Sequence, residues 1–399
     1  MTVQDLDALQ AHLQAWDRLG RDAPQRLATL LPSWADACFR HGPEPKERWL
    51  CVFAYAGDRL VGVLPLIIGA HPVLGLSRPV LRTCDRHVTI ENVALAPDQA
   101  VAALQALLAE VRRAVPNHVG IDLMSLRAES PVLRAVQDGA EGYIIHRGSR
   151  SLKSYLDVRG DYESYLSTIR QMRSNIRRYR RRLDSRGNVT VEIRRGPSAR
   201  EEFLDEFLEL EASGWKGRGG TAILQNANSR AYYKTLVKNF AAGGDLEWYA
   251  IRVDGRLVAA RLGIRCGNAL MLPKIAFDED FADCRPGTLL TAEVIKDAFA
   301  RPEIEEINHM SSAEAHRFWH MPQDEYTTLH LVRDTAVPVL FQLSRVALRS
   351  YYRDRVRPRI PQAVTEAQRR FQRRGGRRPR RAADGRFASP REPGHDENQ

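Results

Sequence analysis

Residues Phe277 to Phe299 read FDEDFADCRPGTLLTAEVIKDAF and place a Pro-Gly corner between an acidic loop and an amphipathic pattern that predicts a helix from Thr288 to Ala300. Proline is favoured at the start of a helix, and glycine lets a backbone approach a ligand closely. The first turn of a helix also has unpaired N–H groups and a partial positive charge, so anions bind there readily. The corner therefore fits either a phosphate site or an ordinary turn.

Two hairpins of similar sequence lie half a chain apart. The first, YAGDRLVGVLPLI, spans residues 55–67, and the second, RVDGRLVAARLGI, spans residues 252–264. In each, a β-rich run enters a Gly-Asp or Asp-Gly turn and a second β-rich run leaves it, which is a strong hairpin signal. Repetition at this distance predicts two copies of one domain.

Helical patterns surround the second hairpin. One helix, capped by Asp161 and ended by Gly187, is predicted from a periodic apolar stripe made of Tyr165, Ile169, Met172, Ile176, Tyr179 and Leu183. Its remaining surface is rich in arginine, including Arg177, and is either a solvated face or the rim of a cleft for an anionic ligand. After this helix come two more helices, three strands, the helix at the Pro-Gly corner and a short strand at 306–310, in the order α-α-β-β-β-α-β. Neither a GxGxxG nor a Walker A sequence occurs.

Composition places the chain among ordinary globular proteins. Its 399 residues are 43% apolar, which is enough for two domains. The longest apolar stretch, residues 60–70, is too short and broken to span a bilayer, and the N-terminus lacks a signal pattern, so we expect a cytoplasmic protein. Five scattered cysteines without CxxC spacing argue against a disulfide framework and against a zinc site, and we expect no metal.

The net charge of +11 is concentrated at the C-terminal end. From Arg345 to Gln399 there are 16 Arg against 6 Asp and Glu. We expect an amphipathic basic helical extension at 336–370 and a disordered basic tail at 371–399, because the tail has few core-forming residues. The tail is interpreted either as an electrostatic contact with RNA, anionic lipid or an acidic partner, or as a solubilising segment without a specific ligand.

Four blocks carry a family resemblance: RQMRSNIRRYRRRL, EASGWKGRGGTAI, VDGRLVAARLGI and PKIAFDEDFADCRPGTLL. In this order and spacing they resemble the GNAT-fold acyltransferases of the CelD type, whose C-terminal half is called the BioF2-like acetyltransferase domain and which are related to the FemAB peptidyltransferases. The resemblance covers roughly Tyr155 to Val332. It implies a mixed α/β fold of two tandem GNAT-like domains, at 1–154 and 155–335, each a mostly antiparallel mixed sheet flanked by helices.

The resemblance also implies a reaction and a donor site. The reaction is transfer of an acyl group from acyl-CoA to an amine or hydroxyl of a sugar, a lipid-linked saccharide or a peptide, in envelope or exopolysaccharide biosynthesis. The phosphates of the donor are expected at the Arg285 side chain and the backbone N–H groups of Gly287, Thr288 and Leu289. A backbone N–H within 273–276 is expected to stabilise the oxyanion.

Candidate catalytic residues follow from the need to deprotonate the acceptor: Glu211, Lys274, Asp278 and His309. Alternatives stay open, since Glu211 could face water, Lys274 and Asp278 could form a structural ion pair, and His309 could be a packing residue. The acceptor site is expected to be lined by Trp215, Lys216, Arg218, Arg177 and Trp319. The segment SSAEAHRFWH keeps Trp319 but lacks the lysine that relatives have before this tryptophan.

Three other functions compete. The first is aminoacyl transfer from a charged tRNA, as in FemAB relatives, for which the arginine-rich helix and basic tail would suit RNA. The second is a non-catalytic scaffold that docks peripherally at the inner membrane through its basic C-terminal helix. The third is a cysteine-nucleophile enzyme built on Cys284 with His309 and His316.

Overall fold

The computed structural model describes residues 1–73, 76–84, 87, 89–343, 348 and 351. The chain divides into two compact units, Met1–Ala347 and Leu348–Gln399. The tail predicted at 371–399 lies outside the described residues, and so does most of the extension predicted at 336–370. Within the described part of the chain, no helix has both the length and the apolar character needed to cross a membrane.

The first unit contains both helices and strands, often in runs of one kind. The strands are β1 (Thr2–Val3), β2 (Arg48–Ala56), β3 (Arg59–Val73), β4 (Leu76–Thr83), β5 (Ala94–Leu95), β6 (Gly120–Arg127), β7 (Tyr143–Asp157), β8 (Val189–Arg195), β9 (Leu246–Val253), β10 (Arg256–Cys266), β11 (Ala269–Phe277), β12 (Glu306–Asn308) and β13 (Gln323–Arg333). The α-helices are α1 (Leu6–Leu9), α2 (Leu13–Arg21), α3 (Pro32–His41), α4 (Ala100–Ala114), α5 (Pro131–Gly139), α6 (Tyr162–Thr168), α7 (Arg170–Asp184), α8 (Phe203–Ser213), α9 (Trp215–Arg218), α10 (Ala227–Ala242), α11 (Pro286–Phe299) and α12 (Ala336–Pro338).

All strands belong to one mixed sheet in the order β1-β2-β3-β4-β6-β13-β7-β12-β11-β10-β9-β8, with β5 paired to β3. The long strand β7 changes partners along its length. Its residues Tyr143 to Ser154 pair with β13, and Tyr155 to Asp157 pair with β12. Strand β13, near the end of the range predicted for the second domain, therefore lies between β6 and β7.

The same topology occurs twice, as β2-β3-β4-α4-β6 and as β9-β10-β11-α11-β12. Each copy has two antiparallel strand pairs followed by a helix and a parallel strand. Both predicted hairpins are confirmed. In the second, Asp254 and Gly255 have φ angles of 49° and 83°, the left-handed conformation that a two-residue hairpin turn requires and that Asp-Gly adopts readily.

Strand β11 bulges and then leaves β12. Its register with β10 shifts between the pairs Leu262–Lys274 and Ile264–Met271, so β11 contains an extra residue there. Pro273 lies in this bulge, where a missing N–H donor is tolerated. The parallel pairing with β12 covers only Ala269–Met271, and the remaining residues of β11, 272–277, continue without β12. We call this separation beyond Met271 and Asn308 the β11–β12 divergence.

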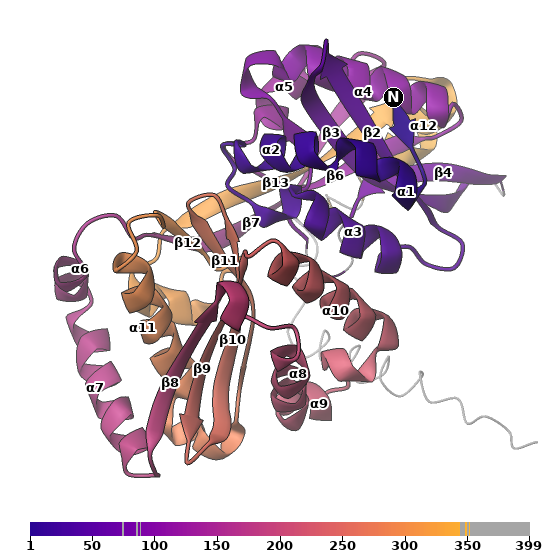
Figure 1. Ribbon diagram of the computed structural model, residues 1–399. Coiled ribbons are helices and arrows are strands. Elements are labelled where there is room, and N and C mark those ends of the chain that lie inside the picture. The colour runs from indigo at the N-terminus through magenta and orange to yellow at the C-terminus, as the bar shows by residue number, and fades with distance from the viewer. Residues whose placement is uncertain (74–75, 85–86, 88, 344–347, 349–350, 352–399) are drawn as a thin grey trace, which may run out of the picture. The chain divides into compact units, whose positions relative to one another are not determined.

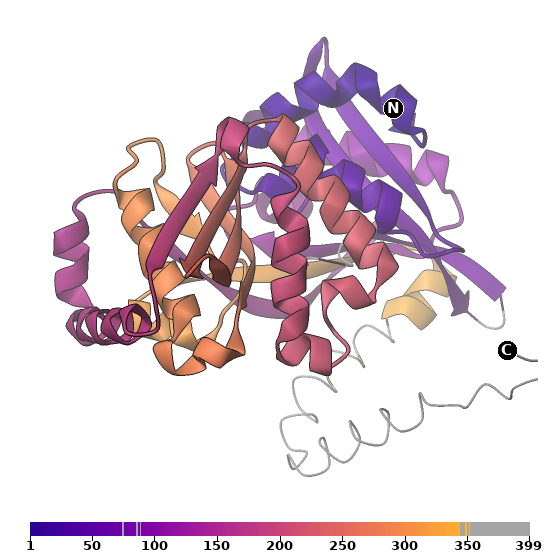
Figure 2. The same ribbon diagram turned by 60° about the horizontal axis from the view of Figure 1, so that its bottom comes forward.

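Helices cover both faces of the second sheet copy. Helices α7 and α11 lie on one face of β8–β11, and α8 and α10 lie on the other (Figures 1 and 2). Helices α7 and α11 contribute to one hydrophobic core, which includes Val258 and Leu290. Helices α8 and α10 contribute to another, which includes Leu262 and Phe207. Helix α10 also packs against α3 from the first half of the chain, so both halves contribute to the second core.

Two local predictions need correction. The single helix expected from Asp161 to Gly187 is two helices, α6 and α7, because Ile169 between them has φ −112° and ψ 44° and ends the first. The Asp161 cap is confirmed, since its side chain accepts the Ser164 N–H. The order predicted from the pattern also omitted β8, an exposed edge strand with mixed polar and apolar residues.

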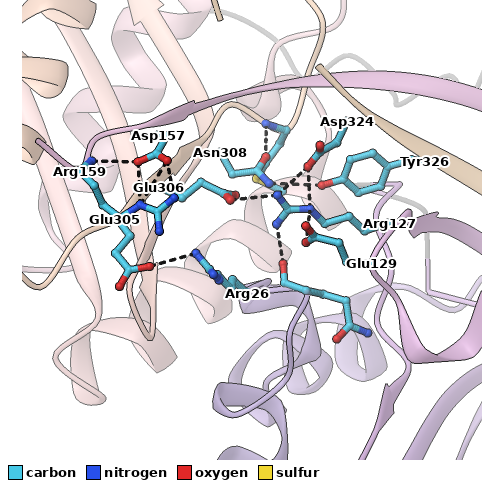
Figure 3. Close-up of polar contacts among 12 residues, drawn as sticks. Arg26, Arg127, Glu129, Asp157, Arg159, Glu305, Glu306, Asn308, Asp324 and Tyr326 are labelled. Atoms are coloured by element: carbon cyan, nitrogen blue, oxygen red, sulfur yellow. Dashed lines mark hydrogen bonds and ion pairs between the residues drawn. The ribbon is translucent and has the colours of Figure 1, made fainter. Parts of the chain in front are cut away.

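A buried arginine connects the two halves (Figure 3). Arg127 at the end of β6 donates to Asp324 Oδ2 at 2.8 Å, to the Gln25 carbonyl at 2.7 Å and to Glu306 Oε2 at 2.9 Å. Its side chain is 2% exposed. Because Glu306 belongs to β12, this network fixes the strand on which the β11–β12 divergence depends.

We expect Arg127→Met to lower the free energy of unfolding by about 3–5 kcal/mol, because it leaves buried carboxylates without their counter-charge. Arg59→Met is the matched control, since Arg59 forms an exposed pair with Asp98 and should change stability by about 0–1 kcal/mol. Urea denaturation followed by circular dichroism measures both variants. A loss as small as that of the control would show that the Arg127 network does not hold the halves together.

Candidate functional site

The β11–β12 divergence places the predicted site residues on the two faces of strand β11. Glu211, Trp215 and Lys216 come from α8 and α9 on one face. The start of α11 lies on the other face (Figure 1). The two groups are therefore separated by one strand, as a donor and an acceptor site on a shared reaction centre would be.

Glu211 is buried, at 4% exposure, and does not face water. Its Oε1 accepts a hydrogen bond from Lys216 Nζ at 2.7 Å, and its Oε2 accepts the Ile223 N–H at 2.9 Å. Both carboxylate oxygens are thus engaged by donors. Glu211 is therefore joined to Lys216 of α9 and to the backbone at Ile223.

Lys274 lies on the same face of β11 and has no carboxylate partner among the described residues. Its Nζ stands over the Tyr233 ring, 5.2 Å from the centroid. Burial lowers the pKa of Lys274, the nearby Lys216 lowers it further, and Glu211 opposes the shift. The Tyr233 hydroxyl is buried without a hydrogen-bond partner, and burial raises its pKa. Among the described residues, Lys274 thus has the Tyr233 ring as its neighbour, and the Tyr233 hydroxyl accepts and donates no hydrogen bond.

Asp278 does not pair with Lys274. Its carboxylate pairs with Arg256 instead, in a close contact at the start of the acidic turn η6 (Glu279–Cys284). Glu279 in the same turn accepts the Trp215 N–H at 2.7 Å and pairs with Arg218 at 2.5 Å. The acidic loop therefore holds α9 in place.

Trp215 does not fill a core position, because it is 59% exposed. A cavity of about 30 Å³ lies beside it, lined by Leu210, Glu211, Gly214, Trp215, Lys216, Ile275, Ala276 and Phe277. The cavity is about large enough for one water molecule. In its lining, Glu211 of α8 and Lys216 of α9 lie next to residues 275–277 of β11, which do not pair with β12.

The start of α11 has fewer free donors than the sequence predicts. Arg285 has φ 51° and begins the helix, with Pro286 next. The N–H groups of Thr288 and Leu289 both donate to the Arg285 carbonyl, at 2.9 and 3.1 Å. Gly287 N–H is the donor without a partner among the described residues of this turn. The Arg285 side chain is exposed and likewise has no partner there.

A buried cluster lies beyond this turn, on the same face of β11. Arg261 of β10 donates from Nη1 to Thr291 Oγ1 at 2.9 Å and from Nη2 to His309 Nδ1 at 3.1 Å. The His309 and His316 rings are 4.4 Å apart. Burial, with the charge of Arg261, lowers the pKa of His309 well below its usual value and that of His316 to about 4, so both are neutral at pH 7.

The remaining predicted residues lie apart from these groups. Arg177 is on the exposed face of α7, and Trp319 is buried in the core formed with α11. Cys284 is a poor nucleophile, because burial and Asp283 raise the pKa of its thiol. Among the described residues, no group of three or more His, Cys, Asp or Glu side chains could hold a metal ion.

Sequence reasoning missed Arg261 and Tyr233. Arg261 had a usable signal, since it is a charged residue inside the apolar run LVAARLGI of a central strand. Tyr233 had none, because the YY pair of α10 fits an ordinary helix core.

Known proteins share this fold. Residues 170–317 match the model of an acetyltransferase (GNAT) domain. FemX superposes with a TM-score of 0.59 at 14% identity, over 86% of this chain and 99% of its own. A conserved protein of unknown function from Bacteroides thetaiotaomicron superposes with a TM-score of 0.51 at 14% identity, over 81% of this chain and 97% of its own. Such low identities show the fold alone.

A tandem GNAT protein from the clavulanic acid biosynthesis pathway aligns with a TM-score of 0.45 at 14% identity, over 84% of this chain and 99% of its own. No curated protein matches. The mixed α/β fold with a large mixed sheet flanked by helices, expected from the sequence, is confirmed. The family match is confined to residues 170–317, and that part of the chain is similar to GNAT-type acetyltransferase domains.

Proposed function

We propose that the protein is an acyl-CoA-dependent N- or O-acyltransferase of the CelD and BioF2-like type. The acceptor class is a sugar, a lipid-linked saccharide or a peptide amine, in envelope or exopolysaccharide biosynthesis. The observation that carries the proposal is the β11–β12 divergence with the start of α11 beside it. An acyl-CoA donor bound here would meet the part of β11 that does not pair with β12. It would also meet the Gly287 N–H and, next to it, the exposed Arg285 side chain.

The residues at the start of α11 fit the phosphates of coenzyme A. Gly287 N–H and the Arg285 guanidinium supply a donor and a charge, and the helix adds its partial positive end. Thr288 and Leu289 contribute through the helix they begin rather than as free donors. The thioester of the donor supplies the activated acyl group, and the N–H groups of residues 274–276 on β11 are candidates for the oxyanion site.

Lys274 is the proton acceptor that this arrangement favours. Lys274 is a buried lysine with a lowered pKa and has no ion-pair partner among the described residues, whereas both oxygens of Glu211 already accept hydrogen bonds. Glu211 then holds Lys216 and the turn at Ile223. Trp215, Lys216 and Arg218 border the acceptor side, whereas the burial of Trp319 and the distant face of Arg177 leave them supporting roles at most.

Transfer from a charged tRNA is the second candidate. Its specific support is the exposed arginine face of α7, formed by Arg170, Arg177, Arg178 and Arg181. Salt-sensitive tRNA binding and activity destroyed by ribonuclease would distinguish it from acyl-CoA transfer. Peripheral attachment of a cytoplasmic protein to the inner membrane, or to an acidic partner, is proposed for the basic tail, which lies outside the described residues.

Gly287→Glu should abolish acetyl-CoA binding, because it adds a carboxylate where the pyrophosphate is expected. We expect micromolar binding in the wild type and at least about 100-fold weaker binding in the variant. Gly287→Ala is the control, since a Cβ there meets Phe277 Cδ1 at 3.4 Å and Ile275 Cδ1 at 3.6 Å, which are ordinary contacts. Calorimetric titration measures all three. Folded wild-type protein that binds no CoA ester would favour the tRNA donor.

Lys274→Met should lower kcat/KM by about 10²- to 10⁴-fold. In the wild type, kcat/KM should rise with pH and level off above the folded pKa of Lys274, which lies below 10.5. Glu211→Gln removes a charge that raises this pKa, so the rising limb should move to lower pH. Glu209→Gln on the exposed face of α8 should leave the profile unchanged. If Glu211→Gln abolishes the rising limb altogether, Glu211 itself is the base.

A further inference from the structure

The Arg261 cluster contains a buried positive charge without a negative partner. Arg261 is 5% exposed, and its contacts are the neutral groups Thr291 Oγ1 and His309 Nδ1. Within the described residues no carboxylate forms an ion pair with it. Burial lowers its pKa to about 10, the opposite of what an ion pair does. An unpaired buried charge is costly unless a partner completes it.

The hydrogen bonds show which atoms lack a partner. His309 is neutral, and its Nδ1 accepts the Arg261 N–H, so its proton is on Nε2. That N–H is buried without an acceptor, and the Arg261 Nε–H is as well. His316 Nδ1 is the third buried nitrogen without a partner. At least two N–H donors, on His309 and Arg261, therefore lack a hydrogen-bond acceptor among the described residues, next to the positive charge of Arg261.

The cluster lies where β11 and β12 separate. Asn308 is the last β12 residue paired with β11, and His309 follows it directly. Arg261 pairs with Ile275 in the register of β10 and β11, on the unpaired part of β11. Thr291 is on α11 and donates to the Gly287 carbonyl, so the cluster is joined to the turn proposed for the donor phosphates.

We propose that Arg261, His309 and His316 form a binding site for a carboxylate of the substrate. The site rests on the proposed function for the identity of the molecule that carries the carboxylate. One carboxylate balances one guanidinium, and its two oxygens match the two unpaired N–H donors. A doubly charged phosphate would leave a net negative charge buried, and a metal cation would be repelled by Arg261.

The carboxylate has two possible sources within the same reaction. It belongs either to a dicarboxylic acyl group on the donor or to an acidic acceptor. Malonyl-CoA against propionyl-CoA tests the donor, because the two acyl groups are alike in length. Muramic acid against glucosamine tests the acceptor, because they differ by a lactyl group that ends in a carboxylate.

Calorimetric titration of the full chain with these four ligands is compared between wild type, Arg261→Met and Arg265→Met. Arg265 lies on the same strand and pairs with Asp245, so it is the matched control. We expect the wild type and Arg265→Met to prefer the carboxylate of one pair by at least about tenfold. Arg261→Met should reduce that preference to about one, and Arg261→Lys should restore only part of it because lysine lacks the second N–H of the fork.

Unfolding without ligand separates binding from folding. Because Arg261→Met removes an unpaired buried charge, the melting temperature of the unliganded variant should equal or exceed that of the wild type. A lowered melting temperature, or equal preference in both ligand pairs for wild type and variant, would overturn the carboxylate site. Acetyl-CoA, titrated into the same samples, keeps the two proposals apart. If acetyl-CoA binds but no carboxylate is preferred, only the proposed carboxylate site is wrong. If muramic acid binds in an Arg261-dependent way but no CoA ester binds, only the proposed acyl-CoA donor is wrong.

Discussion

The second half of the chain depends on the contact between Arg127 and strand β12. Arg127 binds Glu306 at one end of this strand, and Asn308 at the other end donates to the Tyr326 hydroxyl at 3.2 Å (Figure 3). Both contacts involve residues of β6 and β13. A strand of three residues would not hold its place by ladder hydrogen bonds alone. Strand β12 pairs with β11 over all three of its residues and ends at Asn308, so the longer strand β11 continues without it.

The first copy of the same topology does not keep such an opening. Its parallel pair covers only Leu81–Ile121 and Arg82–Asp122, but Thr83 continues the contact. The Thr83 hydroxyl accepts the Met124 N–H at 2.9 Å and lies 3.5 Å from the Asp122 carbonyl. Helix α4 follows Gln99 at the end of the turn Pro97–Gln99, whereas α11 follows Arg285 directly, so the two helix starts differ in sequence. The first half supplies Arg127, which binds Glu306 of β12.

Local signals predicted the local structure well. The Asp-Gly hairpin, the Asp161 cap and the proline at the start of α11 each depend on a few neighbouring residues, so the sequence alone was sufficient. The pairing of β13 between β6 and β7, and the break at Ile169, depend on distant packing and were not predictable from periodicity. The same holds for the site. Glu211 was predicted as a candidate base, but its burial and its two donors, Lys216 and the backbone of Ile223, come from contacts that no pattern connects.

Three arginines are buried among the described residues. Their partners distinguish the arginines that stabilise the fold from the one proposed to bind a substrate. Arg301 donates to both oxygens of Glu247 at 2.8 Å, and Arg127 meets Glu306 and Asp324. In both, burial alone would lower the pKa, yet the carboxylates raise it. Arg261 is also buried, but among the described residues no carboxylate pairs with it. The chain thus supplies counter-charges wherever an arginine only holds strands together. Of the three arginines buried in the described part of the chain, Arg261 at the divergence of β11 and β12 is the one without a carboxylate, which is why the missing negative charge is assigned to a substrate.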